Sequence, residues 1–319
     1  MPRKTVYVQT HNFPDPDALA SGFGLCAWFE QQGFSPVLCY DGQLDKRACK
    51  KMVEQFHIQA APVSQLPELT ENDFLICVDT QKKAGNITLL PHEIDACIDH
   101  HPTFSPAFYQ YEDLRKTGSC ASIVADYFDK AGLTPSGNVA SALLYGIKID
   151  TRNFTRGVTE LDIQMFQFLN RVCDGDSLRR VSSNTLSFTD LKAYSSAIES
   201  LQVYGLVGFA EIDFPCSDDL IAMISDFFLS LAEIELSVVF SRREDGIKIS
   251  IRSESEAVHA GNWASRALAG YGTGGGHPYM AGGVIPPENI SLLGQYPDET
   301  IRNLFLQALP AVGGGAFAR

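Results

Sequence analysis

The 319-residue chain lacks the sequence features of membrane, secreted and thiolate-metal proteins. No apolar run reaches membrane-spanning length, and residues 1–5 lead directly into an apolar segment without a signal-peptide pattern. The eight cysteines include no Cys-x-x-Cys pair. Two of them, Cys77 and Cys97, lie in apolar runs where a free thiol packs as a small hydrophobe. These absences predict a cytoplasmic protein with reduced thiols and no membrane partner.

Positive charge is also scarce. Lys and Arg total 25 against 38 Asp and Glu, so the net charge is −13. Stable binding to duplex nucleic acid needs a basic surface, and this composition argues against it. A small anionic substrate is still compatible with the composition, because metal ions and a few local Arg or Lys residues can neutralise it in a cleft.

Short apolar runs alternate with amphipathic segments through the first half of the chain. This pattern predicts an α/β domain whose parallel sheet is covered on both faces. Its expected strands are 5–10, 35–40, 73–79 and 94–99, and its expected helices are 18–32, 44–56, 117–128 and 140–149. Strands at 235–240 and 246–252 and a helix at 257–269 predict a smaller α/β domain with a mixed sheet. We therefore expect two domains, 1–170 and 201–319, joined by a polar linker at 171–200.

The first expected strand ends in a cluster of metal-ligand side chains. His11, Asp15 and Asp17 lie within seven residues, and Pro14 and Pro16 restrict the backbone on either side of Asp15. A helix is not expected to begin before Asp17. Imidazole and carboxylate donors suit a divalent ion such as Mn(II). The alternative is that these are turn residues and that Asp17 only caps the following helix.

Two more expected strands end in aspartate, at Asp79 and Asp99. Ligands of open α/β sheets bind beyond the carboxyl ends of the strands, so we expect both residues at the same edge as His11. His100 and His101 follow Asp99 directly, and three consecutive ionisable residues at a strand end cannot all be core. In the alternative interpretation, His100 merely bonds a neighbouring carbonyl group.

Asp150 ends an apolar helical stretch, where the helix dipole is negative and disfavours a carboxylate. A nearby cation would offset this. Arg152 could provide it through a salt bridge, but a metal ion would do so more completely.

These motifs, in this order and at these spacings, resemble the DHH phosphoesterase family over roughly the first 155 residues. The resemblance implies a Rossmann-like domain with two manganese ions, one held by His11, Asp15 and Asp79 and the other by Asp17, Asp79, His100 and Asp150. Two such ions can activate water for attack on phosphorus. His101 is then a candidate for contacting the phosphoryl oxygens or the leaving group. Asp99 is a candidate for orienting an imidazole. Either residue could instead be structural.

A glycine-rich stretch covers residues 270–283. By itself it is typical of a flexible loop, although such glycines can also expose N–H groups to an anion. The run Gly274-Gly275-Gly276-His277 resembles the DHH-associated C-terminal domain over about residues 200–319. This resemblance implies that these four residues bind substrate, with Arg252 as a candidate phosphate contact. The alternative for Arg252 is a solvated position at a strand end.

The two resemblances imply a manganese-dependent phosphoesterase for short oligonucleotides or small nucleotides, such as adenosine 3′,5′-bisphosphate or linear dinucleotides. A homodimer is implied as well. Pro16, Ala20 and Thr273 depart from the usual family pattern, in which glycine is common at each position. The alternative function is a non-catalytic nucleotide-binding protein on the same fold.

Overall fold

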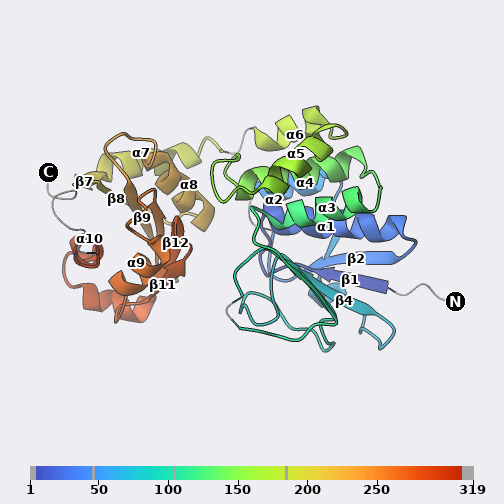
Figure 1. Cartoon of the computed structure of the whole chain (residues 1–319). Coiled ribbons are helices and arrows are strands. Elements are labelled where there is room, and N and C mark those ends of the chain that lie inside the picture. Colours follow the sequence, from blue (N-terminus) through green and yellow to red (C-terminus); the bar gives the residue numbers. More distant parts are fainter. Residues whose placement is uncertain (1–4, 45–46, 104, 184–185, 311–319) are drawn as a thin grey trace. The chain divides into compact units, whose positions relative to one another are not determined.

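The computed structural model describes residues 5–44, 47–103, 105–183 and 186–310 (Figure 1). The chain divides into two compact units, residues 1–185 and 186–319. The division falls inside the segment 171–200 that we expected to be a linker. That segment contains two helices, α6 (Gly175–Ser182) and α7 (Asp190–Ser200), so most of it is regular structure.

The N-terminal unit contains a parallel six-stranded sheet, which confirms the expected α/β class. The strand order is β3-β2-β1-β4-β5-β6, and every neighbouring pair is parallel. The strands are β1 (Thr5–Gln9), β2 (Ser35–Tyr40), β3 (Ala60–Pro62), β4 (Phe74–Val78), β5 (Ala96–Asp99) and β6 (Tyr111–Leu114). The chain adds β2 and β3 on one side of β1 and then returns to its other side with β4. This reversal between β1 and β4 is the position where open α/β sheets bind ligands.

Both faces of this sheet are covered, as predicted, but helices pack on only one of them (Figure 1). The helices are α1 (Pro16–Gln31), α2 (Arg47–Phe56), α3 (Cys120–Lys130), α4 (Gly137–Asp150) and α5 (Glu160–Asn170). Val6 and Val8 point into their core, whereas Tyr7 points to the other face. That face is covered by connecting segments that contribute Ile87 and Tyr109. These segments bury the strands fully, so the sequence pattern could not distinguish them from helices.

The helix α1 begins earlier than expected. Asp15 is its N-cap, and the Oδ1 atom of Asp15 accepts hydrogen bonds from the main-chain N–H groups of Asp17 and Ala18, both at 3.0 Å. Pro16 occupies the first helical position, where its missing N–H group is not needed. The alternative in which Asp17 only caps this helix is therefore wrong.

The C-terminal unit is built on a mixed six-stranded sheet with the order β11-β12-β10-β9-β8-β7. Among the described strands of this sheet, only the β8–β9 pair is parallel. The strands are β7 (Gln202–Tyr204), β8 (Val207–Ile212), β9 (Leu236–Arg243), β10 (Gly246–Ser253), β11 (Thr273–Gly276) and β12 (Met280–Ile285). The helices are α8 (Asp218–Phe228), α9 (Ala260–Ala267) and α10 (Pro297–Gln307). This arrangement confirms the predicted mixed α/β class.

Part of the glycine-rich stretch forms the edge strand β11, so its interpretation as a flexible loop is wrong. Gly274 pairs with Gly283 and Gly275 pairs with Gly282. The strand lies directly against α9, because a Cβ atom on Gly261 would overlap the main-chain oxygen of Gly276. Glycine at position 261 therefore permits the close approach of helix and strand.

No helix among the described residues combines the length and apolarity that crossing a membrane requires.

Because α9 lies close to β11, the addition of a single methyl group at Gly261 should lower the stability of the fold. We expect Gly261→Ala to lower the free energy of unfolding by about 1–3 kcal/mol, because the methyl group meets rigid main-chain atoms. Urea unfolding followed by tryptophan fluorescence measures this, since Trp263 is fully buried in the same helix.

Gly275→Ala is the matched control. A Cβ atom there meets nothing within 4 Å, so we expect little change in stability. Equal stability of the two variants would contradict the packing described.

Candidate metal centre

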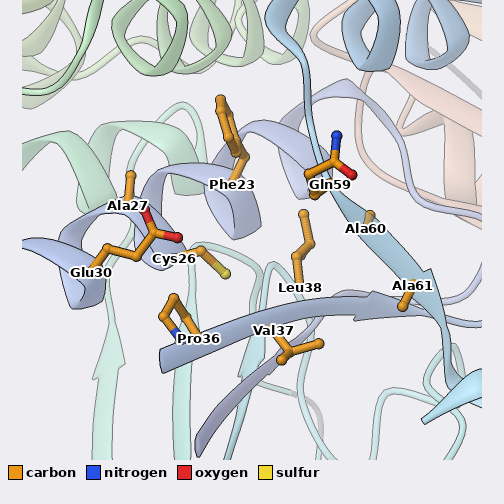
Figure 2. Close-up of a pocket in the computed structure, with 10 residues that line it drawn as sticks. All are labelled: Phe23, Cys26, Ala27, Glu30, Pro36, Val37, Leu38, Gln59, Ala60 and Ala61. Atoms are coloured by element: carbon orange, nitrogen blue, oxygen red, sulfur yellow. The ribbon is translucent and has the colours of Figure 1, made fainter. Parts of the chain in front are cut away.

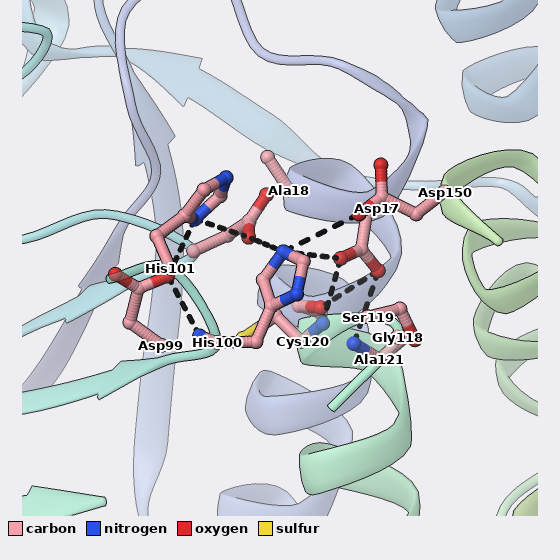
Figure 3. Close-up of polar contacts among 12 residues, drawn as sticks. Asp17, Ala18, Asp99, His100, His101, Gly118, Ser119, Cys120, Ala121 and Asp150 are labelled. Atoms are coloured by element: carbon pink, nitrogen blue, oxygen red, sulfur yellow. Dashed lines mark hydrogen bonds and ion pairs between the residues drawn. The ribbon is translucent and has the colours of Figure 1, made fainter. Parts of the chain in front are cut away.

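Eight predicted residues converge at the carboxyl edge of the N-terminal sheet. Figure 3 labels Asp17, Asp99, His100, His101 and Asp150. Donor atoms within 4.8 Å of one another form three overlapping groups, namely His11 with Asp15 and Asp79, Asp17 with His100 and Asp150, and Asp79 with His100 and His101. Asp99 lies beside His101. The predicted convergence of these distant residues is therefore present in the fold.

His11 follows β1 and has a defined orientation. Its Nδ1 atom lies 2.9 Å from the main-chain oxygen of Asn12. A carbonyl oxygen only accepts, so Nδ1 carries a proton, and in the neutral imidazole Nε2 keeps its lone pair. That Nε2 atom lies 3.8 Å from Asp15 Oδ1 and 3.9 Å from Asp79 Oδ2. The imidazole therefore presents a ligand nitrogen to two carboxylates.

Asp79 lies at the centre of the groups and is only 2% exposed. Its Oδ2 atom faces His11, and its Oδ1 atom lies 3.4 Å from His100 Nε2. Oδ1 accepts no hydrogen bond from any described residue, although it is buried. The backbone of Asp79 is in the left-handed region, with φ 59°, which is uncommon for a residue with a side chain. A buried carboxylate oxygen without a donor and in a strained turn suits a cation ligand.

His100 and its partners form the second group. His100 Nδ1 donates to the main-chain oxygen of Thr117 at 3.1 Å, which leaves Nε2 as the free nitrogen. Nε2 lies 3.3 Å from Asp150 Oδ2 and 3.9 Å from Asp17 Oδ2. The alternative that His100 only bonds a carbonyl group accounts for Nδ1 and leaves Nε2 unexplained.

Asp17 is held by the N-terminus of α3 instead of capping its own helix. It is 1% exposed, and its carboxylate accepts from the N–H groups of Cys120 at 2.7 Å and Ala121 at 3.0 Å (Figure 3). Helix N-termini stabilise negative charge, so this contact supports the ionised form. The helix expected at 117–128 is α3, and Ser119 is its N-cap. The contacts of residues 117–121 with Asp17 and His100 were not predicted.

His101 is oriented by Asp99. The distance between His101 Nδ1 and Asp99 Oδ1 is 2.8 Å, and Gln81 donates to the other carboxylate oxygen at the same distance. The His101 side chain is 38% exposed, the largest exposure among the histidines of these groups. Its Nε2 atom is therefore the nitrogen available for chemistry with a bound molecule.

Protons or cations must offset the negative charges of the groups. Burial raises the pKa of Asp17 well above its ordinary value, and the carboxylates of Asp79 and Asp150 raise it further. Burial and Asp15 likewise raise the pKa of Asp150 to about 7. Burial would lower the pKa of His11, but the hydrogen bond and charge of Asp15 and the charge of Asp79 outweigh it and raise the pKa to about 9. Without metal, protons must offset the negative charge of the cluster. The donor set of carboxylates and imidazoles fits divalent cations.

The departures from the family pattern are accommodated without loss of a candidate ligand. Pro16 begins α1, and Thr273 begins the strand β11. Ala20 is fully buried in α1 and packs against α4 at Gly146, where a Cβ atom would lie 2.9 Å from that of Ala20. The glycine that lets these helices approach is therefore on α4.

The remaining predicted residues lie in the C-terminal unit. Arg252 on β10 is 8% exposed, and its Nε atom donates to Asp226 Oδ1 at 2.9 Å, so it is not a solvated strand-end arginine. Gly274, Gly275 and Gly276 are in β11. His277 follows them with an exposed side chain, and its main-chain N–H group donates to Met280 at 2.7 Å.

A hollow of about 370 Å³ lies away from the candidate ligands, between α1 and the strands β2 and β3 (Figure 2). Phe23, Leu38 and Ala60 contribute to its lining. None of the predicted site residues lines it. Its apolar walls do not match the chemistry of the metal centre.

Two sequence profiles match the chain. Residues 5–147 match the profile described as DHH family, N-terminal domain, and residues 205–303 match that of the DHHA1 domain. The first covers the strands and helices that position the candidate ligands up to α4. The second covers Arg252 and the glycine-rich stretch.

Two known proteins and one solved structure are similar over most of the chain. An uncharacterized protein of Methanocaldococcus jannaschii is 28% identical over 307 residues, which are 95% of this chain and 62% of that protein. The bifunctional oligoribonuclease and PAP phosphatase NrnA of Thermus thermophilus is 25% identical over 291 residues, covering 88% of this chain and 84% of NrnA. An exopolyphosphatase-related protein from Bacteroides fragilis shares the fold with a TM-score of 0.77 at 20% identity, covering 97% of this chain and 92% of that one.

The profiles match both parts of the chain in the order in which the motifs occur, and the candidate ligands converge at the expected sheet edge. The chain therefore belongs to the DHH phosphoesterase family and carries a DHHA1 domain in its C-terminal part.

Proposed function

We propose that this protein is a metal-dependent hydrolase of phosphate esters in short oligonucleotides or small nucleotides. The observation that carries the proposal is the buried Asp79 carboxylate, whose two oxygens each face a histidine Nε2 atom. An acid in this position can bridge two cations. Membership of the DHH family and the similarity to NrnA support the reaction class.

The proposed ligand sets share Asp79. His11 and Asp15 complete the set of one ion, and Asp17, His100 and Asp150 complete the other. We propose Mn(II) for both, since mixed carboxylate and imidazole donors suit it. When bound, such a pair lowers the pKa of water and neutralises charge that develops on phosphate oxygens.

His101 is the proposed proton donor to the leaving oxygen. Burial would lower its pKa, but the hydrogen bond to Asp99 and the charge of Asp79 raise it. A histidine with a raised pKa holds a proton near neutral pH and can donate it. Asp99 acts on this step by fixing the imidazole, because it accepts a hydrogen bond from Nδ1–H, so that Nε2 is the nitrogen that can donate.

The substrate class follows from charge and similarity. A net charge of −13 disfavours long duplex substrates, which need a basic surface. NrnA is named for activities on oligoribonucleotides and on PAP. We propose that Arg252, Gly274, Gly275, Gly276 and His277 bind the nucleotide.

Product analysis on a small substrate panel tests the reaction. We expect protein supplemented with manganese to hydrolyse at least one of a two-nucleotide RNA, adenosine 3′,5′-bisphosphate and a linear dinucleotide. Because the ions activate water, product formed in ¹⁸O-labelled water should carry the label on phosphate. If all three substrates stay intact while nucleotide still binds, the protein is a non-catalytic binding protein.

Removing the charge of Asp79 tests the bridging role. Asp79→Asn keeps the side-chain shape and tolerates the left-handed backbone, so the fold should persist. Outer-sphere partners of metal ligands are worth about 10–100-fold in activity, and we expect a direct bridging ligand to cost at least about 100-fold. Initial rates and bound manganese should fall together. Normal turnover with normal metal content would refute the assignment.

Metal binding should release protons in a pH-dependent way. In the metal-free protein the pKa of His11 is raised to about 9 and that of Asp150 to about 7, so both groups retain protons below these values. The ion must displace these protons, and its affinity should rise as the pH increases from about 6 to about 8.5. Calorimetry in buffers of different ionisation enthalpy counts the protons, and we expect fewer to be released at the higher pH.

A further inference from the structure

Asp162 is a fully buried carboxylate outside the candidate metal centre. It lies in the first turn of α5 and is 0% exposed. Its Oδ1 atom accepts from Ser122 Oγ at 2.6 Å and Thr117 Oγ1 at 3.2 Å, and its Oδ2 atom accepts from Gly118 N at 2.9 Å. Oδ2 also accepts from the main-chain nitrogen and the hydroxyl of Thr159, both at 2.7 Å. These five donors are neutral, so hydrogen bonds stabilise the buried charge.

A helix cap accounts for only part of this arrangement. The bonds from Thr159 form the capping box of α5, in which an acid in the first turn satisfies the N-cap N–H group. The other three bonds come from a segment 40–45 residues earlier in the chain. Capping does not require them. They fix residues 117–122 against the start of α5.

The segment 117–122 contacts two members, Asp17 and His100, of the metal-ligand group formed by Asp17, His100 and Asp150. The main-chain oxygen of Thr117 accepts from His100 Nδ1. The N–H groups of Cys120 and Ala121 donate to Asp17, as Figure 3 shows.

The link to the third member, Asp150, is indirect and runs through the next residue, Thr151. A Cβ atom on Gly118 would lie 2.6 Å from the Thr151 methyl group and 2.7 Å from Asp162 Oδ2. Gly118 therefore packs between Asp162 and Thr151, the residue that follows Asp150, with no room for a side chain.

The other ligand group is held by different contacts. His11 is oriented by the main-chain oxygen of Asn12, and Asp15 by the N-terminus of α1. No hydrogen bond among the described residues joins Asp162 to either of them. A change in the position of residues 117–122 should therefore weaken the binding of the ion held by Asp17, His100 and Asp150 more than the binding of the other ion.

We propose that Asp162 is a positioning residue for the cation bound by Asp17, His100 and Asp150, and that it acts through the segment 117–122. The proposal rests on the proposed function in that it needs a metal at this group. Substitution of Asp162 by asparagine turns an acceptor into an NH₂ donor that faces N–H or O–H groups. The segment should then shift, and His100 and Asp17 should lose their fixed orientation.

Manganese titration of the full chain, with free Mn²⁺ measured by electron paramagnetic resonance, tests this. We expect the wild type to bind two ions. Asp162→Asn should bind one ion with unchanged affinity and the second about 10–100-fold more weakly, the range found for outer-sphere partners. Saturating manganese should restore most of kcat, because no group that touches substrate has changed.

The control is Leu169→Ala, which removes a fully buried side chain from the same helix and leaves the hydrogen bonds of Asp162 in place. It should lower the free energy of unfolding without reducing the affinity for one ion more than for the other. Should Asp162→Asn fail to fold, Ser122→Ala removes a single bond to Asp162 and should weaken the same ion to a smaller degree.

The role of Asp162 would be overturned if the folded Asp162→Asn variant bound both ions with unchanged affinity, or with equally reduced affinity. Either result would leave the proposed function intact. A wild type that binds no manganese would instead remove the proposed function and this inference with it.

Discussion

Electrostatic repulsion among buried carboxylates is the constraint on which the N-terminal unit depends. Asp17, Asp79 and Asp150 lie around His100, and Asp79 is almost completely buried without a hydrogen-bond donor on Oδ1. Such a cluster is stable only when protons or cations offset the negative charge. In the metal-free chain, burial and the neighbouring carboxylates raise the pKa values of Asp17 and Asp150, so both groups hold protons more readily than usual. A site that binds metal through these groups releases protons when the ions bind. The close carboxylates lower the stability of the metal-free fold and raise its affinity for the ions.

Strand ends and helix termini of the N-terminal unit hold these carboxylates and histidines close together. The reversal of strand order between β1 and β4 brings His11 and Asp79 to neighbouring strand ends, and β5 adds His100. Helix ends complete the site, since Asp15 caps α1, Asp17 receives N–H groups from α3, and Asp150 ends α4. Main-chain oxygens then select the histidine tautomers. Precise ligand placement therefore comes from regular elements and their termini, which are less mobile than loops.

The two units carry different kinds of chemistry. The N-terminal unit concentrates acids and imidazoles, whereas the C-terminal unit contains a glycine-rich edge strand and a buried arginine that is paired with Asp226. Glycine in β11 is explained partly by packing, because a Cβ atom on Gly274 would lie 2.8 Å from the main-chain oxygen of Ala264 in α9. Gly275 is different, since its missing Cβ atom would point into open space. Packing thus requires some glycines of the stretch and leaves others available for binding.

The sequence by itself determined the α/β class, the strand ends that carry His11, Asp79 and His100, and the identity of the candidate ligands, because apolar runs and polar strand ends are local patterns. Only the tertiary structure decided that helices cover a single face of the sheet, since any apolar cover produces the same buried strands. It also decided that Asp17 accepts from the N-terminus of α3, which depends on where α3 lies, whereas Asp15 caps its own helix locally. Asp162 carried a local signal in the Thr-x-x-Asp capping pattern that begins at Thr159, but its bonds to residues 117–122 join segments 40 residues apart. Contacts of that range depend on how helices pack, which a pattern of neighbouring residues does not encode.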